Sequence, residues 1–209
     1  VMAGLILAKC THAPDLCFAS AVGPALCQEW SPLSVGRTED MWMGRGLLHM
    51  SFATVAVELL PAYKPKEFLR PAQINSAGSF NNIAFGKSYT QPRMRLPGTG
   101  GIPDVTVSTD HFFLYVPRHS RLIFTNKLDF VSGMGHVPHR RRGGGPAYLI
   151  SDVGQFDWYQ GQMRLTTLHP GVTLEQVQRK TQFELLVAPD LHETVAPTPE
   201  ELRLLREEI

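Results

Sequence analysis

The stretch "RLPGTGGIPD", residues 95–104, places three glycines within four positions. Each glycine costs chain entropy on folding, so Gly98, Gly100 and Gly101 must serve a purpose. Backbone N–H groups of such a turn, at the start of a helix, can point at an anion or a developing oxyanion. The alternative is a tight turn where a helix packs closely on a strand. A Walker phosphate loop is excluded because no Gly-Lys-Ser/Thr follows, and the G-x-G-G spacing matches the dinucleotide fingerprint poorly.

The elements that must position this loop alternate between helix and strand patterns. Residues 1–10 and 51–60 are predicted to be helices, and two capping boxes, "TLEQ" (173–176) and "TPEE" (198–201), predict two further helix starts. Three segments are strand-like: 111–117, 128–132 and 147–152. A hairpin is expected around "YQGQ". This pattern predicts an α/β fold with an open, mostly parallel sheet and helices on both faces.

Composition limits the function classes. The chain has 209 residues, 43% of them hydrophobic, and a net charge of +1, so neither nucleic acid nor a membrane is expected as a partner. The longest apolar run, "VMAGLILA", is too short to cross a bilayer. Three cysteines and eight histidines without metal-ligand spacing predict reduced thiols, a cytoplasmic location and no metal site. We expect one domain over residues 1–209, with an N-terminal segment missing because the sequence opens inside a helix.

Five segments carry a resemblance to a known family by their order along the chain. They are "AQINSAGSFNN", "PRMRLPGTGGIPD", "KLDFVSGMGH", "YLISDVGQFDW" and "LHPGVTLEQVQRKTQFEL". This order resembles the β subunit of family I CoA-transferases, with the glutaconate CoA-transferase branch nearest, over residues 11–208. The resemblance implies the fold shared by CoA-transferases and some sugar-phosphate isomerases. It also implies an acyl-CoA substrate, with CoA bound only as part of it, and an α-like partner of the same fold that shares the pocket.

The resemblance gives the glycine loop a role. In the family, the loop that matches Gly98, Gly100 and Gly101 approaches the thioester carbonyl. Its backbone amides then serve as an oxyanion hole, and a side chain at these positions would occupy the space that the carbonyl needs.

The family's nucleophile raises a difficulty. Transferases of this family carry a glutamate that takes the acyl group and then holds CoA as a thioester. Counting from Pro14 and matching the family's glycine to Gly23 puts that position at Ala21, and Glu29 lies eight residues further on. An alanine methyl forms no anhydride. The chain is therefore similar to branches that lack this glutamate, a decarboxylase of glutaconyl-type CoA esters and a ring-opening hydrolase of steroid degradation.

Two neighbours of Ala21 have alternative interpretations. Ser20 either donates a hydrogen bond at the acyl end or is a small residue at a strand-to-loop turn. Cys17 is interpreted as a buried structural thiol rather than as a replacement nucleophile.

Other candidates lie further along the chain. Gln73, Asn75 and Asn82, beside Asn81, either order the pocket loop, bind the acyl group or stabilise turns. Arg118 and Arg121 follow a strand end and contact either CoA or a partner subunit. The run Arg140–Arg142 either meets the CoA phosphates or forms a mobile, solvated hairpin tip. His119 and His136 are interpreted as exposed loop histidines.

Three function classes remain open. The first is a β-like subunit that hydrolyses an acyl-CoA or cleaves a C–C bond in it. The second is a genuine CoA-transferase that moves CoA between carboxylic acids. The third is a non-catalytic structural subunit.

Overall fold

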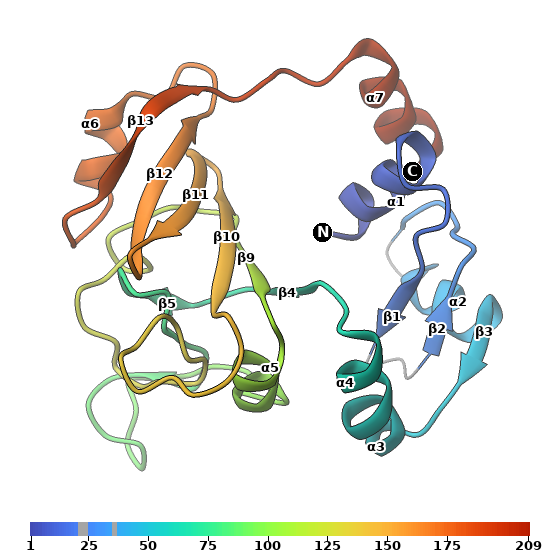
Figure 1. Cartoon of the computed structure of the whole chain (residues 1–209), viewed down its shortest axis with the longest axis horizontal. Helices are drawn as coiled ribbons and strands as arrows, with labels where there is room; N and C mark the ends of the chain where they lie inside the picture. Colours follow the sequence, from blue (N-terminus) through green and yellow to red (C-terminus); the bar gives the residue numbers. More distant parts are fainter. Residues whose placement is uncertain (21–24, 35–36) are drawn as a thin grey trace. The chain divides into compact units, whose positions relative to one another are not determined.

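A computed structural model describes residues 1–20, 25–34 and 37–209 of the chain (Figure 1). The contacts within the chain divide it into two compact units. The first unit comprises Val1–Pro65 and Val195–Ile209, and the second comprises Lys66–Thr194. The expectation of one domain over residues 1–209 stays a prediction.

The first unit combines helices with a small antiparallel sheet. Its elements are α1 (Met2–Thr11), β1 (Phe18–Ser20), β2 (Ala25–Cys27), α2 (Arg37–Gly44), β3 (Gly46–His49), α3 (Phe52–Thr54), the π-helical turn η1 (Val55–Leu59), α4 (Leu60–Tyr63), α7 (Pro199–Arg203) and the π-helical turn η2 (Leu204–Glu208). The three strands pair in the order β1-β2-β3. The helices predicted at 1–10 and 51–60 are confirmed, the second as the continuous run from α3 through η1 to α4.

A small core holds the first unit together. It consists of Ile6, Phe18, Ala25, Cys27, Met41 and Trp42. The Cys27 thiol donates to the carbonyl of Met41 at 3.3 Å, and burial raises the pKa of Cys27. The C-terminal residue belongs to this unit, since the amide of Leu33 donates to the carbonyl of Ile209 at 2.6 Å.

The second unit is built on a six-stranded sheet with strand order β13-β12-β11-β10-β9-β4. Its elements are β4 (Glu67–Leu69), β5 (Gln73–Ile74), β6 (Phe80–Asn81), β7 (Ala84–Phe85), β8 (Met94–Arg95), α5 (Ile102–Ser108), β9 (Phe112–Val116), β10 (Pro146–Ser151), β11 (Gly154–Tyr159), β12 (Gln162–Leu168), α6 (Leu174–Arg179) and β13 (Leu186–Glu193). Strands β4, β9 and β10 run parallel to one another, as do β12 and β13, while β11 is antiparallel to both its neighbours. The α/β fold class is confirmed, with a mixed sheet.

Alternation along the strands builds the core of this unit. In β9, Phe112, Leu114 and Val116 are fully buried while the residues between them are partly exposed, which is the period-two pattern of a strand. They pack with buried residues of the neighbouring strands, among them Leu149 and Phe156. Burial of these large apolar side chains is the main favourable term in the stability of the unit.

Local signals in the sequence are present in the structure. Both Thr173 and Thr198 make reciprocal capping boxes at the starts of α6 and α7. Gln160 and Gly161 both have positive φ, as a two-residue hairpin turn between β11 and β12 requires.

The prediction of a strand at 128–132 is wrong. This segment is a loop, and backbone hydrogen bonds attach its end to the neighbouring strand β6. The amides of Ser132 and Gly133 both donate to the carbonyl of Phe80, at 2.9 and 3.1 Å. The end of this segment therefore contacts β6 without forming a regular ladder.

Candidate functional site

The glycine loop of the second unit leads directly into α5. The amide of Gly98 donates to the carbonyl of Asn82 at 3.1 Å, and the amide of Ile102 donates to the carbonyl of Thr99 at 3.0 Å. Gly98 and Gly100 have φ values of 102° and 50°, a left-handed conformation that favours glycine. The predicted helix start after the glycines is confirmed, with Gly101 as the residue before α5.

The three glycines face open space on this chain. A Cβ added at Gly98, Gly100 or Gly101 would meet no atom within 4 Å, whereas one at Gly135 would lie 2.1 Å from a backbone oxygen. The alternative of a tight turn packed closely between a helix and a strand is therefore wrong. Backbone conformation explains Gly98 and Gly100. Gly101 has an ordinary φ of −80°, so nothing in the described chain requires a glycine there.

The side-chain amides predicted near the site hold the segment on which the glycine loop rests. Oδ1 of Asn82 accepts from the amide of Ala72 at 2.8 Å, and its Nδ2 donates to the carbonyl of Arg70 at 3.0 Å. Oδ1 of Asn75 accepts from the amide of Ser79 at 3.0 Å. Both asparagines therefore stabilise turns. Because the carbonyl of Asn82 also binds Gly98, this residue positions the glycine loop.

Gln73 lies in a buried polar network. Its Oε1 accepts from Nδ2 of Asn81 at 2.7 Å and from the amide of Asp129 at 3.1 Å. The same segment is tied to the sheet, because the indole of Trp158 in β11 donates to the carbonyl of Ser76 at 3.1 Å. The side-chain amides of this segment thus order its backbone.

The loop after β9 holds two different kinds of residue. Arg118 is exposed, and its side chain makes no hydrogen bond or ion pair with any residue that the structure describes. Arg121 is tied to the end of α6 and to the loop after it, since its Nη1 donates to the carbonyls of Arg179 and Thr181 at 3.4 and 3.3 Å. Arg118 is therefore the arginine of this pair whose charge is open to a ligand or a partner.

The interpretation of His119 as an exposed loop histidine is wrong. Its side chain is 2% exposed and stacks on the ring of Phe124, with centroids 3.5 Å apart. Nε2 lies 2.9 Å from Oγ1 of Thr181, and Nδ1 lies 3.3 Å from Oγ of Ser151. Burial lowers the pKa of His119 from 6.5 to about 3, against the smaller opposing effect of Asp152. The ring is a neutral part of the core.

His136 is partly buried rather than exposed. Its Nε2 lies 2.9 Å from the carbonyl of Pro146 at the start of β10. An added Cβ at the neighbouring Gly145 would lie 2.9 Å from this imidazole, so the ring fills space between two segments. The histidine is structural.

Arg140, the first residue of the run Arg140–Arg142, is fixed by hydrogen bonds and is not part of a mobile tip. The guanidinium of Arg140 donates to the carbonyls of Thr106 at 2.8 Å, Gly135 at 3.0 Å and Arg142 at 2.9 Å, and also to that of Met134. These bonds use the donors that would bind a phosphate. Arg141 and Arg142 are exposed.

The candidates of the first unit lie around β1. Ser20 ends this strand and pairs in register with Ala25 of β2. Ala21, the position that matches the family's glutamate, lies outside the described residues. Cys17 is exposed, so its interpretation as a buried thiol is wrong, and Cys27 is the buried cysteine. Cys17 lies immediately before β1.

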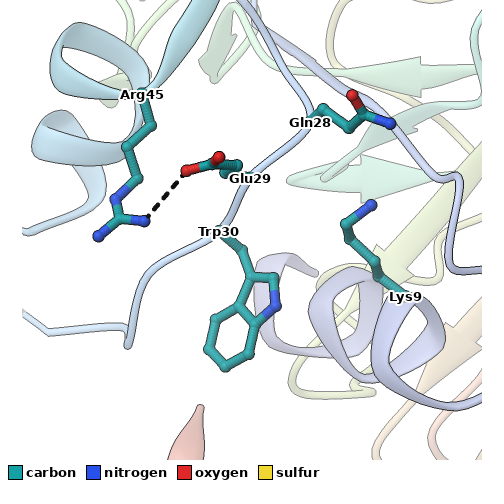
Figure 2. A pocket seen from close by; sticks show the side chains of 5 residues that line it. All are labelled: Lys9, Gln28, Glu29, Trp30 and Arg45. Carbon is teal, nitrogen blue, oxygen red and sulfur yellow. Dashed lines mark hydrogen bonds and ion pairs between the residues drawn. The ribbon is translucent and has the colours of Figure 1, made fainter.

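A pocket of about 490 Å³ lies in the first unit (Figure 2). Five side chains line it: Lys9, Gln28, Glu29, Trp30 and Arg45. Glu29 pairs with Arg45 at 3.4 Å, with both side chains largely exposed. Nζ of Lys9 donates to the carbonyls of Pro14 and Leu16 at 2.5 and 2.9 Å. Arg45 is therefore already in an ion pair, and the ammonium of Lys9 is already hydrogen-bonded to backbone carbonyls of the same unit.

Sequence reasoning missed a basic hairpin beside the glycine loop. Lys87 and Arg93 lie between strands β7 and β8, and Arg95 lies in β8. The segment from Ala84 to Arg95 contains no acidic residue. The spacing of these cations in "GKSYTQPRMR" is the signal that could have found it.

Two other kinds of site are absent from the part of the chain that the structure describes. No helix there is long and apolar enough to cross a membrane. The same residues contain no cluster of three His, Cys, Asp or Glu side chains suited to a metal ion.

Comparison with known proteins supplies the family. No family model matches the chain. Over 148 residues it is 36% identical to a subunit of 3-oxoadipate CoA-transferase from Pseudomonas knackmussii, covering 66% of this chain and 56% of that one. It is 35% identical over 144 residues to the cholesterol ring-cleaving hydrolase IpdB subunit of Rhodococcus jostii, covering 65% and 55%. The chain therefore spans little more than half the length of these two relatives.

Solved structures extend the likeness over the whole chain. Glutaconate coenzyme A-transferase of Acidaminococcus fermentans matches with a TM-score of 0.85 at 26% identity, covering 100% of this chain and 84% of that one. The chain belongs to the family I CoA-transferases, as a β-like chain. IpdAB of Rhodococcus jostii matches with a TM-score of 0.80 at 29% identity, covering 97% and 80%. The decarboxylase AibA/AibB matches with a TM-score of 0.81 at 25% identity, covering 98% and 81%. The resemblance seen in the order of the motifs is confirmed.

Proposed function

We propose that this chain is the β-like subunit of a heteromeric enzyme that acts on an acyl-CoA thioester. We propose further that the enzyme hydrolyses this substrate or cleaves a C–C bond in it. The observation that carries the proposal is Ala21, at the position of the family's nucleophilic glutamate. The likeness to a ring-cleaving hydrolase and to a decarboxylase supports it.

The chemistry follows from the missing carboxylate. Without it, no acyl anhydride forms on this chain and CoA is not transferred through a glutamyl thioester; where a C–C bond is cleaved, CoA stays attached to the substrate as its carrier. The chain's own contribution is then electrostatic, through backbone N–H groups of Gly100 and Gly101 that stabilise negative charge on the thioester oxygen. Gly98 shapes the loop, and the side chains of Gln73, Asn75 and Asn82 order the segment beneath it.

Other parts of the site complete the proposal. Ser20 and Arg118 contribute contacts with the substrate, and an α-like partner of the same fold supplies the acid and base groups. The names of the matched assemblies IpdAB and AibA/AibB, each with two subunits, support such a partner. The three free cysteines support a reducing, cytoplasmic location.

A genuine CoA-transferase is the second candidate. The observation in its favour is the 36% identity to a subunit named as a 3-oxoadipate CoA-transferase. This function needs a nucleophilic carboxylate elsewhere on the chain, and Glu29 is the nearest one after Ala21.

Trapping of the covalent intermediate separates the two candidates. The complex of this chain with its partner is incubated with acyl-CoA, with and without borohydride, and its intact mass is measured. We expect an unmodified chain while acyl-CoA is consumed. A CoA adduct, or a reduced glutamate within residues 14–30, would make the protein an ordinary transferase.

Substitution of Gly101 tests the role of the glycine loop. Gly101→Val is expected to abolish turnover of acyl-CoA and to leave the fold intact, because φ is ordinary and the added side chain meets only open space on this chain. Loss of one oxyanion donor raises the barrier by about 3 kcal/mol, which is roughly a hundredfold in rate. Turnover and circular dichroism are measured together.

Gly4 provides the matched control for this variant. Gly4→Val adds the same side chain into open space on the first unit, and turnover is expected to stay that of the parent. Full activity of Gly101→Val would make the loop structural and refute its proposed role.

A further inference from the structure

The β7–β8 hairpin, residues 84–95, concentrates positive charge. Lys87, Arg93 and Arg95 are all exposed, and the hairpin contains no acidic residue. Within the described part of the chain, none of the three forms an ion pair. The nearby carboxylate of Asp129 accepts from the backbone amide of Gly86 and forms no ion pair with these cations, so their charge is available to an anionic ligand.

The hairpin is held in a defined shape. Gly86, with φ of 117°, makes the bend, and its amide donates to Oδ2 of Asp129 at 2.9 Å. A Cβ at Gly86 would lie 2.9 Å from the amide nitrogen of Arg93, so the two arms of the hairpin approach closely here. The tip is closed by Ser88, whose Oγ accepts from the amide of Gln91 at 3.2 Å.

Aromatic rings support the two guanidinium groups. Arg95 lies over the ring of Tyr89 at 4.4 Å, and Arg93 lies over that of Phe85 at 5.9 Å. Tyr89 in turn contacts Phe130 edge to face at 6.2 Å. Such contacts fix the planes of the guanidinium groups without removing their charge. One donor of Arg95 binds the carbonyl of Tyr89 at 2.5 Å, and its guanidinium makes no other hydrogen bond within the described chain.

The hairpin continues directly into the glycine loop. The amide of Leu96 donates to the carbonyl of Ile83 at 3.1 Å, and the amide of Gly98 to that of Asn82 at 3.1 Å. The five peptide units from Arg95 to Gly100 span at most about 18 Å when extended. A ligand with a reactive group at the glycines and an anionic end on a long flexible arm can therefore reach both places.

We propose that Lys87, Arg93 and Arg95 bind the phosphate groups at the 3′-phosphorylated adenosine diphosphate end of CoA. This inference rests on the proposed function, which places the thioester at the glycine loop. Guanidinium forks bind phosphate oxygens in pairs, and an exposed ammonium adds a point charge. The run Arg140–Arg142 is the less suitable site, because the donors of Arg140 are already bound to carbonyls.

Calorimetric titration of the complex with CoA and with pantetheine, which lacks the nucleotide, tests the proposal. The main variant is Lys87→Gln with Arg93→Gln, since neither side chain makes a hydrogen bond in the described chain. We expect its affinity for CoA to fall about tenfold or more, because hydrogen bonds between charged groups are lost. The affinity for pantetheine is expected to stay within about twofold of the parent. Arg95→Gln, tested separately, is expected to act in the same direction.

A matched control removes the same charges elsewhere in the second unit. Arg179→Gln with Lys180→Gln takes one arginine and one lysine from the exposed end of α6, and CoA affinity is expected to stay that of the parent. The dependence of CoA affinity on salt concentration is expected to weaken in the hairpin variant alone.

Three outcomes would overturn the proposal. The hairpin variants bind CoA as the parent does, or Arg141→Gln with Arg142→Gln loses the affinity instead, or the hairpin variants separate from the partner on size exclusion. Failure of the proposed function has a different signature, since the unmodified complex would then neither bind CoA nor consume acyl-CoA.

Discussion

His119 shows how burial keeps a histidine neutral well below its ordinary pKa. Both ring nitrogens lie next to hydroxyl groups, and the ring stacks on Phe124 and Phe156. Asp152, whose carboxylate accepts the backbone amide of His119, and Lys180 are the charged groups that act on it. Burial outweighs the raising effect of Asp152, and Lys180 acts in the same direction as burial, so the pKa falls to about 3.

The stability of the chain should therefore depend on pH through this residue. Unfolding returns the imidazole to water and to its ordinary pKa of 6.5, so the unfolded chain binds the extra proton. The contribution of neutral His119 is fully present above pH 6.5 and is lost progressively as the pH falls toward about 3. His119→Phe is expected to flatten this dependence, measured as the free energy of unfolding in urea at several pH values.

His139→Phe is the matched control, because it makes the same substitution at a histidine that is exposed. Its pH dependence is expected to follow the parent. If the free energy of unfolding of His119→Phe depends on pH as that of the parent does, other titratable groups cause the dependence.

At the scale of residues, the residue types that a site needs could be recognised in the sequence, but the surroundings of each side chain could not. The glycines at 98 and 100 were identified because three glycines fall within four positions, and the positive φ that explains these two is a local property of the backbone. The burial of His119 depends on Phe124, Ser151 and Thr181, which come together only in the folded unit. No spacing in the sequence reports such a contact.

At the scale of elements, Arg140 joins α5 to the long loop before β10. Its guanidinium binds the carbonyls of Thr106 in α5 and of Met134 and Gly135 in the loop. Arg140→Gln is expected to lower the free energy of unfolding by about 2 kcal/mol, the usual scale for hydrogen bonds of a charged group, and to speed proteolysis of residues 134–145. Urea unfolding and limited proteolysis measure the two effects.

Arg141→Gln is the control for this prediction, since its side chain is exposed and makes no bond in the described chain. It is expected to change the free energy of unfolding by less than about 0.5 kcal/mol. Equal effects of the two substitutions would contradict the role given to Arg140.

Elements with a local cause were predicted well. The capping boxes at Thr173 and Thr198 and the turn at Gly161 depend on neighbouring residues alone, and each is present. The segment 128–132 has the composition of a strand, but Asp129 and Ser132 hold it as a loop by bonds to distant backbone. Tertiary bonds there outweigh strand propensity.

At the scale of the whole molecule, the first unit exposes apolar side chains that a partner would cover. Leu47 and Leu48 of the edge strand β3 are 62% and 50% exposed, and Val57 of η1 is 72% exposed. Expressed alone, the chain is expected to aggregate or to unfold readily, and expressed with its partner it should elute as one complex. Size exclusion with light scattering measures both.

Leu47→Glu should weaken assembly, because it places a charge on this surface. Val195→Glu is the control, since Val195 is also strongly exposed, at 86%, but lies outside β3 and η1. A stable monomer with full activity would contradict the need for a partner.

The fold as a whole was predictable from the order of five motifs, while the mixed character of the sheet was not. Strand β11 runs antiparallel to β12 because a two-residue turn joins them, and it is also antiparallel to β10. In the proposed heteromer, the groups that an α-like partner supplies would lie on another chain, so they could not be predicted from this sequence.

The bond between Trp158 and Ser76 gives the second unit its own optical reporter. The other two tryptophans, Trp30 and Trp42, belong to the first unit, so each unit has separate fluorophores. The indole of Trp158 is attached to the segment that carries Gln73 and Asn75. Any rearrangement of that segment when a ligand arrives would shift the emission of Trp158, and a chain with phenylalanine at positions 30 and 42 would let this signal be followed alone.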